Sequence, residues 1–280
     1  MPGRVAVVAD TTCCLTTDEV GAAGVGLVDL EVVLDGRASP ESQVTVAEVA
    51  DVMRRRRRVS TSSPLPARFL QAYQAARDAG AEQVVSVHLA ARASGTVNIA
   101  RMAARQVDLP VHVVDTGQLG RATGAAVLAA AAAAAADRGV AEVVAAAELT
   151  AARCRTVFCV DDLEHLRRGG RLSTTQTLIG SALAVKPLLI VRDGLVDVLE
   201  KVRTSTRARA RLVTLGLDAV RDADGPSAVF VHHVDAVDPA RALAGQLESR
   251  LPVDVEVVET SPVIAAHVGP GALGVVVCPG

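Results

Sequence analysis

Short valine-rich runs alternate with amphipathic helical patterns along the first half of the chain. The predicted strands cover residues 4–9, 84–88 and 111–114. The predicted helices, in which apolar residues recur at helical spacing, cover residues 45–57, 66–79, 95–107 and 118–136. Strands and helices that alternate in this way predict a parallel sheet covered by helices, with ligand sites at the carboxyl ends of its strands.

The pattern changes after about residue 150. Two strand-like runs within residues 186–202 are joined at Asp193-Gly194, which is a strong signal for a β-hairpin. Helical patterns then alternate with strand patterns, the helices at 204–222 and 238–250 and the strands at 227–234, 253–259 and 274–278. We therefore predict an α/β protein with a Rossmann-like, parallel-sheet domain at 1–152, a mixed α+β domain at 153–280 and a ligand between them.

Composition excludes a nucleic-acid-binding surface of the usual kind. The net charge of −2 gives no sign of a basic surface that would attract phosphates. One Tyr, three Phe and no Trp leave few aromatic side chains on which bases could stack. The basic run Met53–Arg58 closes the predicted helix that begins "TVAEVADVM", and basic residues are favourable at the carboxyl end of a helix. We interpret this run as a solvated helix end and expect no nucleic-acid partner.

Neither a membrane span nor a metal site is predicted. The alanine-rich tract Ala125–Ala136 is shorter than the ~20 residues that a membrane span needs, and a buried helix explains it. The start of the chain shows no targeting segment. Five cysteines without CxxC spacing indicate reduced thiols in a cytoplasmic protein. We therefore expect a cytoplasmic protein with no metal, no cofactor and no stable membrane insertion.

Polar clusters follow three of the predicted strands: "ADTTCCL", "ASGT" and "DTGQLG". In the second cluster, Ser94-Gly95-Thr96 falls where a helix begins. Ser94 is in the position of an N-cap, the commonest role of serine there. Hydroxyls together with the free amides of a helix start also form a site for a small anion, such as a carboxylate or a phosphate. Both interpretations apply to Ser94.

Three other segments contain candidate site residues. In "VSTSSPLPARF", residues 60–63 are a hydroxyl cluster before Pro64, which is also ordinary turn chemistry. In "LRRGGRLS", Arg171 follows two glycines and Ser173 is predicted to cap the next helix. In "AAHVGPGALG", His267 lies in a glycine-rich turn, where a lone histidine is usually a solvated surface residue.

Taken in order, these segments resemble one family over nearly the whole chain. The series "ADTTCCL", "TSSPLPARF", "SVHLAARASGT", "VVDT", "DDLEHLRRGGRLS", "AVKPLLIVRDG", "EKVRT" and "HVGPG" is similar to the DegV-like fatty-acid-binding proteins, the carrier subunits of two-component fatty acid kinases. The resemblance implies two α/β domains, an acyl chain buried between or beneath them, and a carboxyl head held by hydroxyls and a histidine.

The resemblance also implies roles for individual residues. The carboxylate contacts would fall on Thr61 and Ser94, within the ligand-binding segments Thr61-Ser62 and Ser94-Gly95-Thr96, with His267 closing over the head group. Arg171 and Arg203 correspond to positions near the mouth that engage the partner kinase or the phosphoryl group.

The resulting hypothesis is a carrier that binds a long-chain fatty acid and presents it to a separate ATP-dependent kinase for conversion to an acyl phosphate. The chain has neither GxxxxGK[ST] nor GxGxxG after a strand, so we expect no phosphoryl transfer by this protein alone. Transient membrane contact is compatible with such a carrier. Two alternatives stay open: a binder of small soluble anions or sugar phosphates, and a serine hydrolase with Ser94 as nucleophile and His267 as base.

Overall fold

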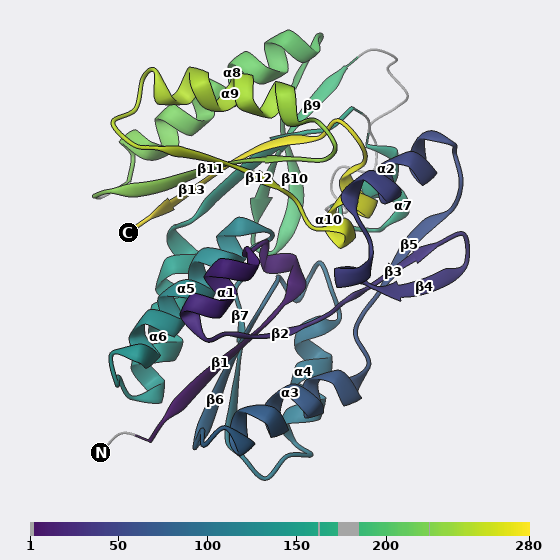
Figure 1. Cartoon of the computed structure of the whole chain (residues 1–280). Helices are drawn as coiled ribbons and strands as arrows, with labels where there is room; N and C mark the ends of the chain where they lie inside the picture. Colours follow the sequence, from purple (N-terminus) through teal and green to yellow (C-terminus); the bar gives the residue numbers. More distant parts are fainter. Residues whose placement is uncertain (1–2, 162, 173–184, 224) are drawn as a thin grey trace.

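The computed structural model describes residues 3–161, 163–172, 185–223 and 225–280. The predicted capping role of Ser173 lies outside these residues. The described chain forms a parallel sheet, a larger mixed sheet and a small antiparallel sheet (Figure 1). The predicted α/β fold, with a parallel sheet in the N-terminal part and a mixed sheet in the C-terminal part, is confirmed.

The first sheet contains the three strands predicted in the N-terminal half and one more. Its strands are all parallel, in the order β2 (Gly26–Val28), β1 (Val5–Asp10), β6 (Gln83–His88) and β7 (Val111–Asp115). Alternate residues of β1 point to opposite faces, as a strand requires. Val7 and Ala9 pack under α5 (Arg121–Ala135) and α6 (Val140–Arg153), whereas Val8 packs under α3 (Pro66–Asp78) and α4 (Thr96–Ala104).

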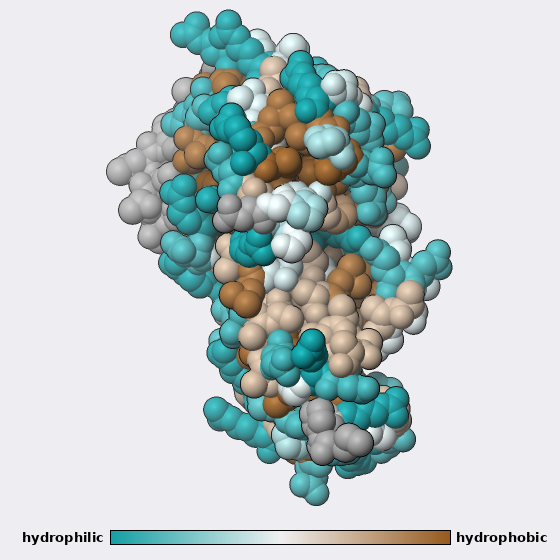
Figure 2. Space-filling model, turned by 90° about the vertical axis from the view of Figure 1, so that its left-hand side faces the viewer, coloured by the Kyte–Doolittle hydropathy of each residue, from teal (hydrophilic) through white to brown (hydrophobic). Residues whose placement is uncertain are grey.

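The alanine-rich tract is a buried helix, as predicted. It forms most of α5, which packs along α6 and over the first sheet. In Figure 2 the moderately hydrophobic surface gathers over the lower half of the molecule, where Figure 1 places these two alanine-rich helices. None of the helices in the described ranges has the length and apolar character to cross a membrane.

The second sheet belongs to the C-terminal half. Its order is β10 (Leu195–Val202), β9 (Lys186–Arg192), β8 (Arg155–Cys159), β13 (Leu273–Pro279), β11 (Ser227–His233) and β12 (Val255–Glu259). The β11–β12 pair is parallel and the other pairs are antiparallel. The predicted hairpin is confirmed, because Asp193 and Gly194 both have positive φ, as a tight turn between β9 and β10 requires. Helices α8 (Ser205–Arg221) and α9 (Val237–Glu248) cover one face of the sheet.

A small antiparallel sheet, which the pattern did not predict, lies over the other face of the second sheet. Its order is β4 (Arg37–Pro40), β3 (Glu31–Leu34) and β5 (Val59–Ser62). It shares a core with α2 (Val46–Arg54), α7 (Glu164–Arg168) and α10 (Pro262–Val268). The short helices α1 (Thr17–Ala23), η1 (Thr11–Cys13) and η2 (Glu41–Gln43) complete the described elements.

The end of α2 corrects the predicted boundary at residue 57. The helix ends at Arg54, and Arg56 has a positive φ of 56°, which an α-helix does not continue through. The arginine run therefore passes from the helix into the following turn. Three of its members pair with acidic side chains: Arg54 with Asp235, Arg55 with Asp51 and Arg57 with Asp35.

Candidate functional site

An apolar cavity of about 180 Å³ lies between the second sheet, the small sheet and α10. Aliphatic and aromatic side chains from distant segments line most of it, among them Leu30, Leu89, Phe158, Val191, Val263 and Val276. Thr61, Ser94, Arg171 and His267 contribute hydroxyl, guanidinium and imidazole groups to the wall, and further polar side chains come from Thr156, His232, His233 and Thr260. The cavity therefore combines a mostly apolar surface with a few polar groups, the usual composition of a small-molecule site.

Strand β5 places Thr61 toward the cavity and Ser62 away from it. Exposure alternates along the strand, so that Thr61 is half-buried and Ser62 is exposed. The Thr61 Oγ1 atom lies 2.9 Å from Nε2 of His267 on α10, which is 206 positions away in the sequence. Ser62 Oγ instead donates to Glu31 Oε2 at 2.9 Å, although Ser62 also lies along the cavity rim.

His267 is uncharged at neutral pH in this environment. Burial and, to a smaller extent, the positive charge of Arg171 lower its pKa to about 4. Gly169 lies against the other side of the ring: a Cβ atom added to this residue would lie 2.6 Å from His267 Nδ1. The imidazole is therefore held between the Thr61 hydroxyl and the Gly169 backbone.

Arg171 connects the two loops that flank the Thr61–His267 pair. Its Nε–H donates to the carbonyl oxygen of Ala93 at 2.9 Å, and its terminal N–H donates to the carbonyl oxygen of Gly169. Ala93 precedes Ser94, and Gly169 contacts His267. Burial lowers the pKa of the guanidinium, but an arginine keeps its charge in a protein. One fixed positive charge therefore lies beside the Thr61–His267 pair.

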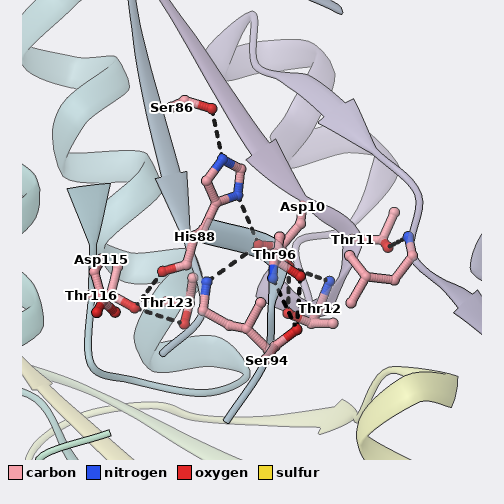
Figure 3. Close-up of polar contacts among 12 residues, drawn as sticks. Asp10, Thr11, Thr12, Ser86, His88, Ser94, Thr96, Asp115, Thr116 and Thr123 are labelled. Atoms are coloured by element: carbon pink, nitrogen blue, oxygen red, sulfur yellow. Dashed lines mark hydrogen bonds and ion pairs between the residues drawn. The ribbon is translucent and has the colours of Figure 1, made fainter. Parts of the chain in front are cut away.

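The predicted N-cap at Ser94 is off by one residue. Helix α4 begins at Thr96 and its N-cap position is Gly95, which offers no side chain. Ser94 Oγ still accepts the N–H of Thr96 at 3.3 Å and lies 2.8 Å from Thr96 Oγ1, as Figure 3 shows. Ser94 lines the cavity, whereas Thr96 is buried behind it and orients it. Helix boundaries are uncertain by about this much in any sequence pattern.

Thr61, Ser94, Arg171 and His267 are thus brought together along one cavity wall. Arg203 is not part of this group. It is exposed, follows the last residue of β10 and does not line the cavity.

A buried polar network, which sequence reasoning missed, supports the loop that carries Ser94. Asp10 at the end of β1 accepts bonds from His88 Nδ1 at 2.9 Å and from the N–H of Leu89 at 3.2 Å. His88 Nε2 lies 2.6 Å from Ser86 Oγ, which in turn lies 2.9 Å from the hydroxyl of Tyr73. Figure 3 shows His88 between Ser86 and Asp10. The polar cluster "ADTTCCL" was the available signal, but its partners lie on another strand.

A second unpredicted group joins the two halves of the molecule. The N–H of Arg121, at the start of α5, donates to Nε2 of His232 on β11 at 3.0 Å. The Arg121 guanidinium pairs with Glu19 and lies 4.6 Å from the centre of the Phe230 ring. Burial lowers the pKa of His232 to about 4, so the ring is neutral and accepts this bond at neutral pH. Hydrogen positions on the ring follow from these partners.

Comparison with known proteins places the whole chain in one group. The model of a family described as "Uncharacterised protein, DegV family" matches residues 4–280. A DegV domain-containing protein of Streptomyces coelicolor is 45% identical over 280 residues, 99% of either chain. One of Mycobacterium tuberculosis is 37% identical over 278 residues, which cover 98% of this chain and 96% of the relative.

Solved structures agree with the sequence comparison. A DegV family protein from Thermus thermophilus, described for its fatty acid binding, matches with a TM-score of 0.91 and 30% identity over 99% of either chain. DegV from Bacillus subtilis, described as a fatty acid binding protein, matches with a TM-score of 0.89 and 28% identity over 99% of this chain and 100% of that one. The family match spans both halves of the fold and every segment of the candidate site. The chain therefore belongs to the DegV family.

Proposed function

We propose that this protein binds a long-chain fatty acid, with the carboxylate at Thr61, Ser94 and His267 and the hydrocarbon chain in the apolar cavity. The observation that carries the proposal is the Thr61–His267 pair in the wall of a mostly apolar cavity. The fatty acid binding described for the Thermus thermophilus and Bacillus subtilis relatives supports it.

The polar side chains at Thr61, Ser94 and His267 suit a carboxylate. Hydroxyls and a neutral imidazole can donate to the head group without a fully buried ion pair, which would carry a large desolvation cost. The charge of Arg171 favours an anion at the same place. In the same way, an anion beside His267 would raise the pKa of the imidazole. A bound carboxylate therefore favours the protonated imidazole, and the protonated imidazole favours the carboxylate.

The cavity wall suits a hydrocarbon chain. Burial of ~14 methylenes contributes on the order of 11 kcal/mol at about 0.8 kcal/mol each, before the cost of ordering the chain is subtracted. This contribution exceeds that of the head group, whose hydrogen bonds determine orientation. A soluble sugar phosphate would leave the aliphatic wall without a partner, so the lining favours the fatty acid over that alternative.

The hydrolase alternative receives no support from the geometry. Nε2 of His267 lies against Thr61 Oγ1, and the hydroxyl of Ser94 is paired with Thr96. A serine nucleophile would need its hydroxyl within hydrogen-bond distance of the base.

We further propose that the carrier works in the cytoplasm with a separate ATP-dependent kinase. The sequence has no phosphate-binding motif of its own, so the partner would supply ATP and convert the presented carboxyl group to an acyl phosphate. Arg171 in the cavity wall and the exposed Arg203 are the residues proposed to face the phosphoryl group or the kinase. Fatty acid would be collected during transient membrane contact.

Mass spectrometry of the organic extract from denatured recombinant protein tests the binding proposal. We expect near-stoichiometric fatty acid from the wild type and strong depletion in Thr61→Val and His267→Gln. Ser62→Ala is the matched control, because its hydroxyl bonds Glu31, and it should retain the lipid. An empty extract from folded wild type that also binds no added fatty acid would refute the proposal. Acyl phosphate formed from ATP by this protein alone would refute the kinase proposal.

A further inference from the structure

One hydroxyl in the cavity wall lacks a partner. Thr156 on β8 is 8% exposed and lines the cavity, and its Oγ1 atom has no hydrogen-bond partner within the described ranges. Thr156 and Phe158 are two positions apart on the strand, so both side chains point to the cavity face of the sheet. A buried hydroxyl without a partner is unfavourable. Within the described ranges, Thr156 Oγ1 shares this property with three other buried side-chain atoms, Gln118 Oε1, Ser227 Oγ and His232 Nδ1.

Thr156 and His267 line the cavity from different elements, β8 and α10. Thr156 pairs in register with Val276 on β13, whose first residue, Leu273, follows the turn after α10. Val276 lies three residues after Leu273, which is about 10 Å along a strand of the usual rise. Figure 1 shows β13 running away from α10 toward the C-terminus. The register therefore places Thr156 away from the end of β13 that follows α10.

Another buried hydroxyl in the same cavity has a partner. Thr260 lines the cavity and is 6% exposed, but its side chain hydrogen-bonds the thiol of Cys14. Within the described part of the chain, the hydroxyl of Thr156 thus differs from that of Thr260, and Nδ1 of His232 is another buried atom of this wall without a partner.

We propose that the ligand class of this site includes fatty acids with a hydroxyl group on the chain, and that Thr156 recognises that hydroxyl. The inference rests on the proposed binding of fatty acids. A plain methylene chain leaves Thr156 Oγ1 unpaired. A hydroxylated chain loses hydrogen bonds to water when it enters the cavity, and Thr156, which can both donate and accept, restores one. Thr156 is accordingly a specificity-determining residue.

Competition binding against a fluorescent fatty acid tests the inference. Stearic acid and a series of hydroxystearic acids that differ in hydroxyl position are compared in the wild type and in Thr156→Val, which preserves shape and removes the hydroxyl. We expect at least one positional isomer to bind the wild type as tightly as stearic acid. In Thr156→Val the affinity for that isomer should fall about tenfold relative to the affinity for stearic acid, as expected for one lost hydrogen bond in a site that excludes water.

Two further variants separate recognition from folding. Thr156→Ser retains a hydroxyl and should keep the preference, which covers the case in which the valine variant does not fold. Thr260→Val removes a hydroxyl that already has a partner and should leave the ratio of affinities unchanged. Folding of each variant is checked by circular dichroism.

The outcomes distinguish this inference from the proposal on which it rests. If wild type binds stearic acid but discriminates against every hydroxy isomer as strongly as Thr156→Val does, the inference is overturned and the fatty acid proposal stands. If Thr156→Val binds stearic acid more tightly than wild type, and wild type favours no isomer, the partner of Thr156 is a bound water. That result would also overturn the inference. Failure of folded wild type to bind stearic acid would overturn both.

Discussion

Gly169→Ala should displace the head-group histidine while leaving the backbone unstrained. Gly169 has φ −71° and ψ −15°, a conformation that alanine adopts readily. The added Cβ atom, however, would lie 2.6 Å from His267 Nδ1 and 3.2 Å from the carbonyl oxygen of His165. Ordinary contact begins near 3.4 Å, so the imidazole must move by roughly 0.8 Å.

This displacement is large compared with the tolerance of the bond to Thr61. The Nε2–Oγ1 distance is 2.9 Å, and hydrogen bonds weaken rapidly beyond about 3.2 Å. A hydrogen bond to a charged group contributes about 1.5–3 kcal/mol, so loss of the histidine contact should weaken fatty acid binding roughly 10- to 100-fold. Competition binding against a fluorescent fatty acid measures the change, and urea unfolding measures stability.

Gly170→Ala is the matched control. No atom of the described residues lies within 4 Å of its added Cβ atom, but its φ of +70° is unfavourable for alanine. We expect a loss of about 1–2 kcal/mol in unfolding free energy and unchanged binding. Wild-type affinity in a folded Gly169→Ala variant, or an equal loss of affinity in Gly170→Ala, would show that His267 does not hold the ligand.

Three further predictions concern stability. Asp10→Asn removes one carboxylate oxygen from a fully buried network and should lower the unfolding free energy by about 2–4 kcal/mol in urea titrations. His232 and His267 each have a pKa near 4 in the folded protein, against an ordinary value of 6.5. Between these two pH values the unfolded chain binds more protons than the folded protein. The unfolding free energy should therefore fall as the pH drops below 6.5, by about 2 kcal/mol per histidine at pH 5. Gly124→Ala places a Cβ 2.5 Å from the carbonyl oxygen of Cys13 and should cost about 1–3 kcal/mol in thermal unfolding.

Controls for these predictions come from the same chain. Asp18→Asn changes an exposed carboxylate in the first turn of α1 and should change stability by less than about 1 kcal/mol. Gly21→Ala, also in α1, meets nothing within 4 Å and should stabilise the helix by about 0.5–1 kcal/mol, opposite in sign to Gly124→Ala. A pH dependence that persists unchanged in a folded His232→Asn, His267→Asn double variant would contradict the histidine argument.

Local pattern accounts for the elements that form from neighbouring residues. The valine-rich runs predicted β1 and β6 because a central strand covered on both faces is largely apolar along its length. Three valines also indicated β7, although it is an edge strand with exposed positions. The turn at Asp193-Gly194 predicted the β9–β10 hairpin because these residues tolerate positive φ. The small sheet escaped prediction because its strands are short and carry polar residues on their exposed face. Local pattern could indicate Ser94 at a helix start but not the exact first residue.

The sequence by itself determined the fold class, the family and the motif segments from which the candidate site is built. Only the tertiary structure decided which side chains meet: Thr61 with His267 across 206 positions, and Gly169 against the imidazole. It also placed Thr156 in the cavity wall, where its hydroxyl has no partner among the residues that the structure describes. The physical reason is that periodicity and turn chemistry act over a few neighbouring residues, whereas these contacts depend on how three sheets pack. Whether a buried hydroxyl is satisfied is a property of that packing, and no local pattern records it.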